Sequence, residues 1–353
     1  MNNILFKLSD IVKQTNTEES DNIDFEKLLG QIILNRIIGH SYFNIKNSKL
    51  NFPSEFIKKL TVIFNDNKKS NEHLEKKLRY LSRILSENKF KYAVLKGSFL
   101  IPFMYEPGIR TSNDIDILIN KSDVSLLQEL LKSEDFVQGY FRDGEIIPAS
   151  RREIIDSLMN NGETIPFMKM INNELLTMDI NFSLDFKADN KIVGDILTDC
   201  VDMVKDEINL KTLNPVDFII HLCCHLYKEA TTYDWVIRRR DLMLYKFSDI
   251  NLFLHKYSDE KYLSLLADRI KQFNVEKECY YTFENSAIIY PQIRNIFKFN
   301  EFINDIKPDN LDFMKQIIYP REKRLFKYDM DFVDWFFCDN RIKALNEIKY
   351  EET

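Results

Sequence analysis

Apolar side chains recur at helical spacing through residues 1–89. Three stripes stand out, within residues 25–33, 56–64 and 74–85, and the last belongs to a helix that we expect to begin near Glu72. Residues three and four apart lie on one face of an α-helix, so each stripe predicts an amphipathic helix. We expect these helices to form a layer that packs on the segments that follow.

The pattern changes at Lys91, where helical spacing gives way to short apolar runs. Residues 92–95 form one run and residues 114–119 another, and a turn-rich stretch over 105–113 separates them. Short apolar runs rich in β-branched residues predict buried strands. The first run ends at residues 96–98, where we expect a helix to begin.

Further strand candidates are residues 136–141, 165–171 and 174–184. Asn172 and Asn173 separate the last two runs, and both residues are favourable in a tight hairpin turn. Within the last run apolar and polar side chains alternate, which predicts a half-buried strand with one polar face.

The stretch 142–164 is polar and suits a mobile loop or a short helical insertion. From Pro215 the helical pattern returns, with helices predicted over 216–228 and 236–257. The order predicts an α+β fold in which a small mixed sheet lies between N-terminal helices and a C-terminal helical bundle. The domains that we predict are residues 1–89, 90–200 and 201–353.

Composition and charge narrow the classes of function. The chain has 353 residues and a net charge of -6, so it lacks the basic footprint of a protein that coats nucleic acid. Its 5 cysteines include no C-x-x-C pair, which argues against a disulfide scaffold or a cysteine zinc site. We see no signal peptide and no apolar run near the ~20 residues of a membrane helix. We therefore expect a cytoplasmic protein with no membrane partner.

Two carboxylates two residues apart are the main sign of chemistry. Asp114 and Asp116 fall on one predicted strand, so their side chains share a face. Like charges this close are costly unless a cation lies between them, and oxygen ligands suit Mg²⁺ or Mn²⁺. Asp179, on the polar face of a later strand, is the expected third carboxylate, with Asp185 as its alternative. An acidic pair taken alone is more often simply solvated.

Gly97 and Ser98 lie where the first strand turns into a helix, and backbone N–H groups at such a turn suit a phosphate. A strand ending in Gly-Ser, then an acidic pair, then a lone acid resembles the DNA polymerase beta–like nucleotidyltransferase superfamily. The runs 95–97, 105–110 and 114–118 resemble more closely the bacterial "uncharacterised nucleotidyltransferase" family.

This resemblance implies a nucleotidyltransferase core and a role for each matching residue. Asp114 and Asp116 would bind the metal ions that bridge a nucleoside triphosphate, expected to be ATP, and Asp179 would complete the metal site that activates the acceptor hydroxyl. The nucleotide-binding residues that it implies are Lys96, Gly97, Ser98 and Arg110. The implied reaction is in-line attack on the α-phosphorus, with pyrophosphate leaving.

The acceptor side is expected in the C-terminal helices. Its candidates are His221, His225, Lys246 and Asp249. For the two histidines the alternatives are satisfied core residues or a zinc site that lacks further ligands, and for Lys246 and Asp249 an ordinary ion pair within one helix. The basic run 238–240 is either a solvated face or a contact for an anionic acceptor or tRNA.

We therefore expect a metal-dependent nucleotidyltransferase that acts on a small molecule, a peptide or a sugar. One alternative is a toxin-like or regulatory enzyme that modifies tRNA or a protein, although the net charge of -6 weighs against a nucleic-acid partner. Another is a catalytically silent nucleotide-binding protein that serves a biosynthetic cluster.

Overall fold

The computed structural model describes residues 2–13, 23–47, 52–86, 88–160, 162–184 and 190–350. The chain forms two compact units. The sheet unit is Val62–Phe218, and the helical unit combines Met1–Thr61 with Ile219–Thr353. The division falls inside two helices, α4 (Ser54–Leu85) and α9 (Pro215–Thr231), and the domain boundaries near residues 89 and 200 stay a prediction.

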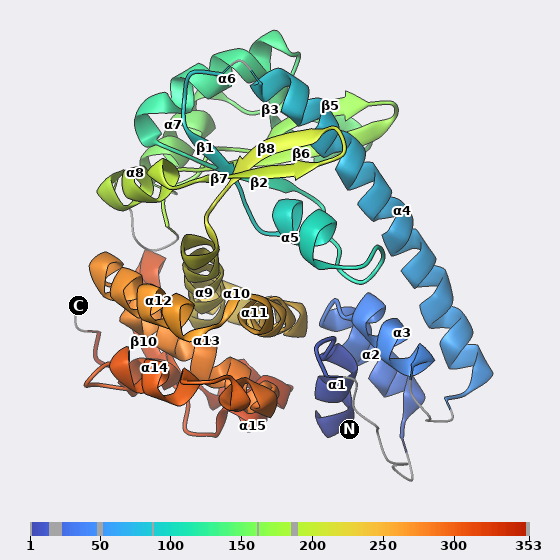
Figure 1. Cartoon of the computed structure of the whole chain (residues 1–353), viewed down its shortest axis with the longest axis vertical. Helices are drawn as coiled ribbons and strands as arrows, with labels where there is room; N and C mark the ends of the chain where they lie inside the picture. The colour runs from blue at the N-terminus through green and yellow to red at the C-terminus, as the bar shows by residue number, and fades with distance from the viewer. Residues whose placement is uncertain are drawn as a thin grey trace. The chain divides into compact units, whose positions relative to one another are not determined.

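The sheet unit is built on a sheet with the strand order β4-β3-β5-β6-β2-β1-β8-β7 (Figure 1). Pairing is parallel between β2 and β6 and between β1 and β8, and antiparallel elsewhere, so the sheet is mixed as predicted. Its strands are β1 (Tyr92–Val94), β2 (Ile115–Ile119), β3 (Val137–Arg142), β4 (Glu145–Pro148), β5 (Phe167–Ile171), β6 (Glu174–Asn181), β7 (Val201–Lys205) and β8 (Ile208–Thr212).

The predicted hairpin between β5 and β6 is present. Ile171 pairs with Glu174, which leaves Asn172 and Asn173 as a two-residue turn. Both have positive φ, 51° and 64°, which asparagine adopts more easily than most residues. The β7–β8 hairpin lies beyond residue 200, where we expected only helices, and it extends the sheet past β1.

The other helices of this unit are α5 (Gly97–Met104), α6 (Val124–Ser133), α7 (Arg151–Asn160) and α8 (Asn190–Thr198). The stretch 142–164 holds the end of β3, all of β4 and the short helix α7, so the predicted helical insertion is present, but β4 was not predicted. One face of the sheet and the buried stripes of α4 and α6 form a single apolar cluster. Residues 56–85 lie in one continuous helix and not in the two that we predicted, because no glycine or proline interrupts the polar stretch between the stripes.

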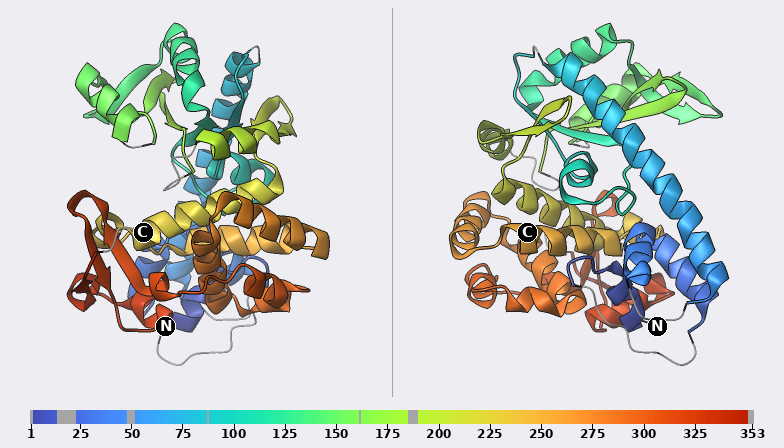
Figure 2. Two further views of the ribbon diagram at one scale, coloured as in Figure 1. Left: turned by 90° about the vertical axis from the view of Figure 1, so that its left-hand side faces the viewer. Right: turned by 45° about the vertical axis from the view of Figure 1, so that its right-hand side comes forward.

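The helical unit holds most of the remaining helices (Figure 2). They are α1 (Asn2–Ser9), α2 (Phe25–Leu34), α3 (Ile38–Lys46), α10 (Tyr233–Ile237), α11 (Leu244–Tyr257), α12 (Glu260–Phe273), α13 (Glu276–Ile289), α14 (Phe299–Asp305) and α15 (Phe332–Phe337). A small antiparallel sheet of β9 (Gln316–Tyr319), β10 (Arg324–Lys327) and β11 (Asn346–Ile348) completes it, and we did not predict these strands.

The predicted single helix over 236–257 is in fact two helices, α10 and α11. Arg239 has a left-handed backbone, with φ 54°, between them. Asp241 then turns inward and forms a buried ion pair with Arg341. This pairing needs the chain to leave the helical path, which the apolar spacing alone does not reveal.

The α+β fold class is confirmed: a mixed sheet and a largely helical C-terminal region are both present. Within the described part of the chain, no helix combines the length and the apolar character needed to cross a membrane.

Candidate active site

Strands β2 and β6 bring the predicted aspartates together. They pair in parallel, and their register sets Asp116 directly beside Asp179. Side chains at paired positions point to the same face of a sheet, so both carboxylates lie on the face opposite the apolar cluster. The alternate residues Ile115 and Ile117 belong to that cluster. Asp114 precedes the first residue of β2 and lies two positions from Asp116.

Electrostatics couples these carboxylates. The pKa of Asp179 is raised from 3.8 to about 7, first because the group is removed from water and then because of the negative charges of Asp116, Asp114 and Glu163. The positive charge of Lys96 opposes this rise. A carboxyl with a pKa near 7 can take up a proton at neutral pH, a property that catalytic acids and bases need. Asp185, the alternative third acid, lies outside the described residues.

Lys96 forms an ion pair with the central aspartate. Its Nζ lies 2.9 Å from Oδ1 of Asp116, and the two side chains are 20% and 9% exposed. The backbone of Lys96 has φ 46° and ψ -124°, a conformation that favours glycine. A residue held in such a region costs on the order of 1–3 kcal/mol and persists where its surroundings impose it, often at functional sites.

The predicted phosphate turn lies at the start of α5. A Cβ at Gly97 would stand 2.5 Å from both Cβ and Oγ of Ser112, so only glycine allows this close approach. The hydroxyl of Ser112 in turn donates to Oδ1 of Asp114 over 3.2 Å, so the residue that packs against Gly97 also contacts the acidic pair. Ser98 is 1% exposed, and its hydroxyl has no hydrogen-bond partner among the described residues.

Arg110 lies in the loop that leads to the acidic pair. Its side chain is buried and donates to the carbonyl of Thr111. Asn71 of α4 holds the same loop: its Oδ1 accepts from the N–H of Gly108 at 2.7 Å, and its Nδ2 donates to the carbonyl of Arg110 at 2.9 Å. The structure thus assigns Arg110 a place in loop packing, and its contact with a phosphate stays a prediction.

Sequence reasoning missed Asn71 and Ser112. Asn71 lies three positions before Leu74 and seven before Leu78, on the stripe that packs on the sheet, and it is 4% exposed. A polar residue on a buried stripe was the available signal, because such a side chain must find hydrogen-bond partners inside the protein.

The four acceptor-side candidates belong to the helical unit. Glu229, which we did not predict, joins them: it forms an ion pair with Lys246 of α11, and its Oε1 lies 3.3 Å from Nε2 of His225. The ring centroids of His221 and His225 lie 6.3 Å apart. Lys246 and Asp249 are buried, and the ion pair seen for Lys246 runs to Glu229 of α9. Their role in acceptor binding stays a prediction.

No group of three or more His, Cys, Asp or Glu side chains is disposed to hold a metal ion in the part of the chain that the structure describes. At the aspartates, the ammonium of Lys96 forms an ion pair with Asp116, whose carboxylate a metal ion at this site would need.

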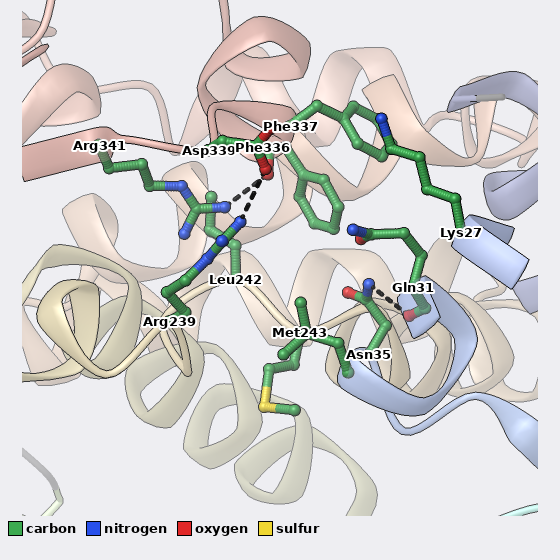
Figure 3. A pocket seen from close by; sticks show the side chains of 11 residues that line it. Lys27, Gln31, Asn35, Arg239, Leu242, Met243, Phe336, Phe337, Asp339 and Arg341 are labelled. Atoms are coloured by element: carbon green, nitrogen blue, oxygen red, sulfur yellow. Dashed lines mark hydrogen bonds and ion pairs between the residues drawn. The ribbon is translucent and has the colours of Figure 1, made fainter. Parts of the chain in front are cut away.

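A cavity of about 130 Å³ in the helical unit lies beside the basic run (Figure 3). Arg239, the middle residue of that run, lines it and forms an ion pair with Asp339 at 3.3 Å. Arg341 also lines this cavity, is held by Asp241 and donates to the carbonyl of Phe336. None of the predicted site residues lines this cavity.

Comparison with known proteins gives one family and one solved structure. The family model described as "Uncharacterised nucleotidyltransferase" matches residues 21–291. An antigenic nucleotidyltransferase-like protein from Paracoccidioides brasiliensis is 16% identical, with a TM-score of 0.40 over 65% of this chain and 94% of that chain. A search of curated proteins found no match.

Proposed function

The chain belongs to the family of uncharacterised nucleotidyltransferases, and we propose that its aspartate site moves a nucleoside monophosphate from a nucleoside triphosphate to an acceptor. The proposed nucleotide is ATP, and the proposed acceptor is a hydroxyl or similar group on a small molecule, a peptide or a sugar. The observation that carries the proposal is the register of β2 and β6, which sets Asp116 beside Asp179 with Asp114 two residues away.

A divalent cation suits the chemistry of these ligands. All three are carboxylates, and the pKa of Asp179 is raised to about 7, first by burial and then by the negative charges of Asp116 and Asp114. A bound cation relieves such repulsion, and hard oxygen ligands favour Mg²⁺ or Mn²⁺. With Lys96 against Asp116, the aspartates as they stand do not form a ready metal site. We propose that Asp114, Asp116 and Asp179 hold the ion once this ion pair opens, and that the bound ion would supply Lewis-acid stabilisation of phosphate charge.

The start of α5 is the proposed place for the triphosphate. The N-terminus of a helix attracts anions, because its first N–H groups point outward and its dipole is positive there. The buried hydroxyl of Ser98 lies in this first turn without a partner among the described residues. An unpaired buried hydroxyl costs on the order of 1–3 kcal/mol, which a phosphate oxygen would recover.

Asp179 is the proposed acceptor of the proton that the attacking hydroxyl releases. Its pKa of about 7 describes the metal-free chain; a bound cation would lower this pKa and favour the carboxylate form, which is the form that accepts a proton. The acceptor oxygen forms its bond to the α-phosphorus as the bond to the β-phosphate oxygen breaks, and pyrophosphate leaves.

Titration calorimetry of ATP with the full chain in Mn²⁺ tests this proposal. The Asp114→Asn, Asp116→Asn double variant should lose the metal-dependent part of ATP affinity. Asp143→Asn is the matched control, because Asp143 is exposed and its φ of 51° suits asparagine. Metal-dependent ATP binding that survives in the double variant would refute the proposed site.

A further inference from the structure

The ammonium of Lys96 already neutralises one of the proposed metal ligands. It lies 2.9 Å from Oδ1 of Asp116, and the carboxylate side chain is 9% exposed. We propose that Lys96 is a resident counter-ion of the aspartate site, which excludes free metal ion and yields Asp116 only when metal and nucleotide arrive together. This inference rests on the proposed function, since it assumes that Asp116 binds the metal ion of the nucleotide complex.

The backbone explains why Lys96 reaches this carboxylate. Leu95 N–H donates to the carbonyl of Asp116 over 3.0 Å, so Leu95 lies opposite Asp116 on the neighbouring strand. Strand alternation would send the next side chain, that of Lys96, to the other face of the sheet. The positive φ of Lys96 ends the strand instead, and its ammonium reaches the aspartate face.

A metal ion and the ammonium compete for the same oxygen. A divalent ion bound to Oδ1 of Asp116 would stand a few ångströms from the ammonium, and like charges at that range repel strongly in a partly buried site. The pair therefore has to open before Asp116 can bind metal. The cost of opening the pair weakens the binding of a free metal ion, because the ion brings no anion for the ammonium.

A nucleotide changes this balance. Lys96 directly precedes α5, where we place the triphosphate, so its ammonium can turn from the carboxylate to a phosphate oxygen. Asp116 would then be available to hold the metal ion of the nucleotide complex. Metal and nucleotide should therefore each raise the affinity of the protein for the other, and Lys96 should be the source of a large part of this coupling.

The test compares Lys96→Met with the wild type by Mn²⁺ electron paramagnetic resonance and ATP titration of the full chain. Without nucleotide, the variant should bind Mn²⁺ on the order of tenfold more tightly than the wild type, because the competing charge is gone. With Mn²⁺ present, it should bind ATP more weakly, so metal–nucleotide coupling shrinks. Mn²⁺ affinity without nucleotide that is unchanged or lower in the variant would overturn the inference.

Two further variants keep the result interpretable. Lys91→Met removes an exposed lysine at the far end of β1 and should leave both affinities unchanged. Lys96→Arg retains a cation and should keep free Mn²⁺ out; tight binding of Mn²⁺ alone by this variant would also count against the counter-ion. If Lys96→Met fails to fold, Lys96→Arg and Lys96→Gln provide the comparison.

The inference and the proposed function fail in different ways. Loss of metal-dependent ATP binding in Asp116→Asn, together with unchanged Mn²⁺ affinity in Lys96→Met, would refute the counter-ion role of Lys96 but support the proposed aspartate site. Metal-dependent ATP binding that persists in Asp116→Asn would refute the proposed aspartate site itself, whatever the result for Lys96→Met.

Discussion

Replacing Asp179 with asparagine should stabilise the metal-free protein at neutral and higher pH. The carboxyl has a pKa raised from 3.8 to about 7 in the folded chain, mainly by burial and then by Asp116 and Asp114. A group whose pKa is raised by folding stabilises the protein fully at pH values below its pKa in the unfolded chain. That contribution is lost as the pH rises through its pKa in the folded chain. Asparagine does not titrate, so its advantage over aspartate should grow across this window.

The magnitude follows from the same shift. Between pH ~5.5 and ~8 an aspartate with these two pKa values loses about 2 kcal/mol of folding free energy relative to a group that does not titrate. Because Asp179 is only partly buried, we expect ~1–2 kcal/mol, a measurable difference in denaturant unfolding.

The assay is urea unfolding of wild type and Asp179→Asn in EDTA at a series of pH values. The difference in unfolding free energy should move in favour of the variant from pH 5.5 to 8. Added Mg²⁺ should reduce that advantage, because the ion binds the wild-type carboxylate. A difference that is independent of pH, or one that moves toward the wild type, would refute the coupling that we assign to these aspartates.

Three other substitutions probe the parts that position the site. Gly97→Ala places a Cβ 2.5 Å from Ser112, so it should cost on the order of 1–3 kcal/mol in urea unfolding and weaken ATP binding; unchanged values would show that the loop moves freely. Asn71→Ala leaves two backbone groups of the neighbouring loop unpaired and should cost ~2–3 kcal/mol, whereas a cost below ~0.5 kcal/mol would mean that water replaces the amide. Glu229→Gln removes the charge that pairs with Lys246 and should lower acceptor transfer while ATP affinity stays constant. A parallel fall in ATP affinity in that variant would argue against an acceptor-side role.

Local patterns predicted the elements near the site well. The runs at 92–95 and 114–119 became β1 and β2, and the alternation after Asn173 became β6. These elements follow from apolar spacing and turn residues, which act over a few residues. The shared face of Asp114 and Asp116 also follows from spacing alone.

Contacts between distant segments could not be read in the same way. The pairing of Asp116 with Asp179 depends on β2 lying next to β6, which is a property of the whole sheet. The Lys96 ion pair depends on a positive φ at a residue that is not glycine, and no local pattern predicts that conformation. The β7–β8 hairpin was missed because its strands are short and half exposed, so their apolar signal is weak.

Label transfer from ATP tests the central claim most directly. The full chain is incubated with Mg²⁺ and either α-³²P-ATP or γ-³²P-ATP, with separate pools of small molecules, peptides, tRNA and protein as acceptors. We predict that α-label, and not γ-label, moves into the small-molecule or peptide pool with release of pyrophosphate, and that Asp114→Asn with Asp116→Asn abolishes it. Transfer of the γ-label, transfer of the α-label that survives in the double variant, or no transfer to any pool would contradict nucleotidyl transfer at this site.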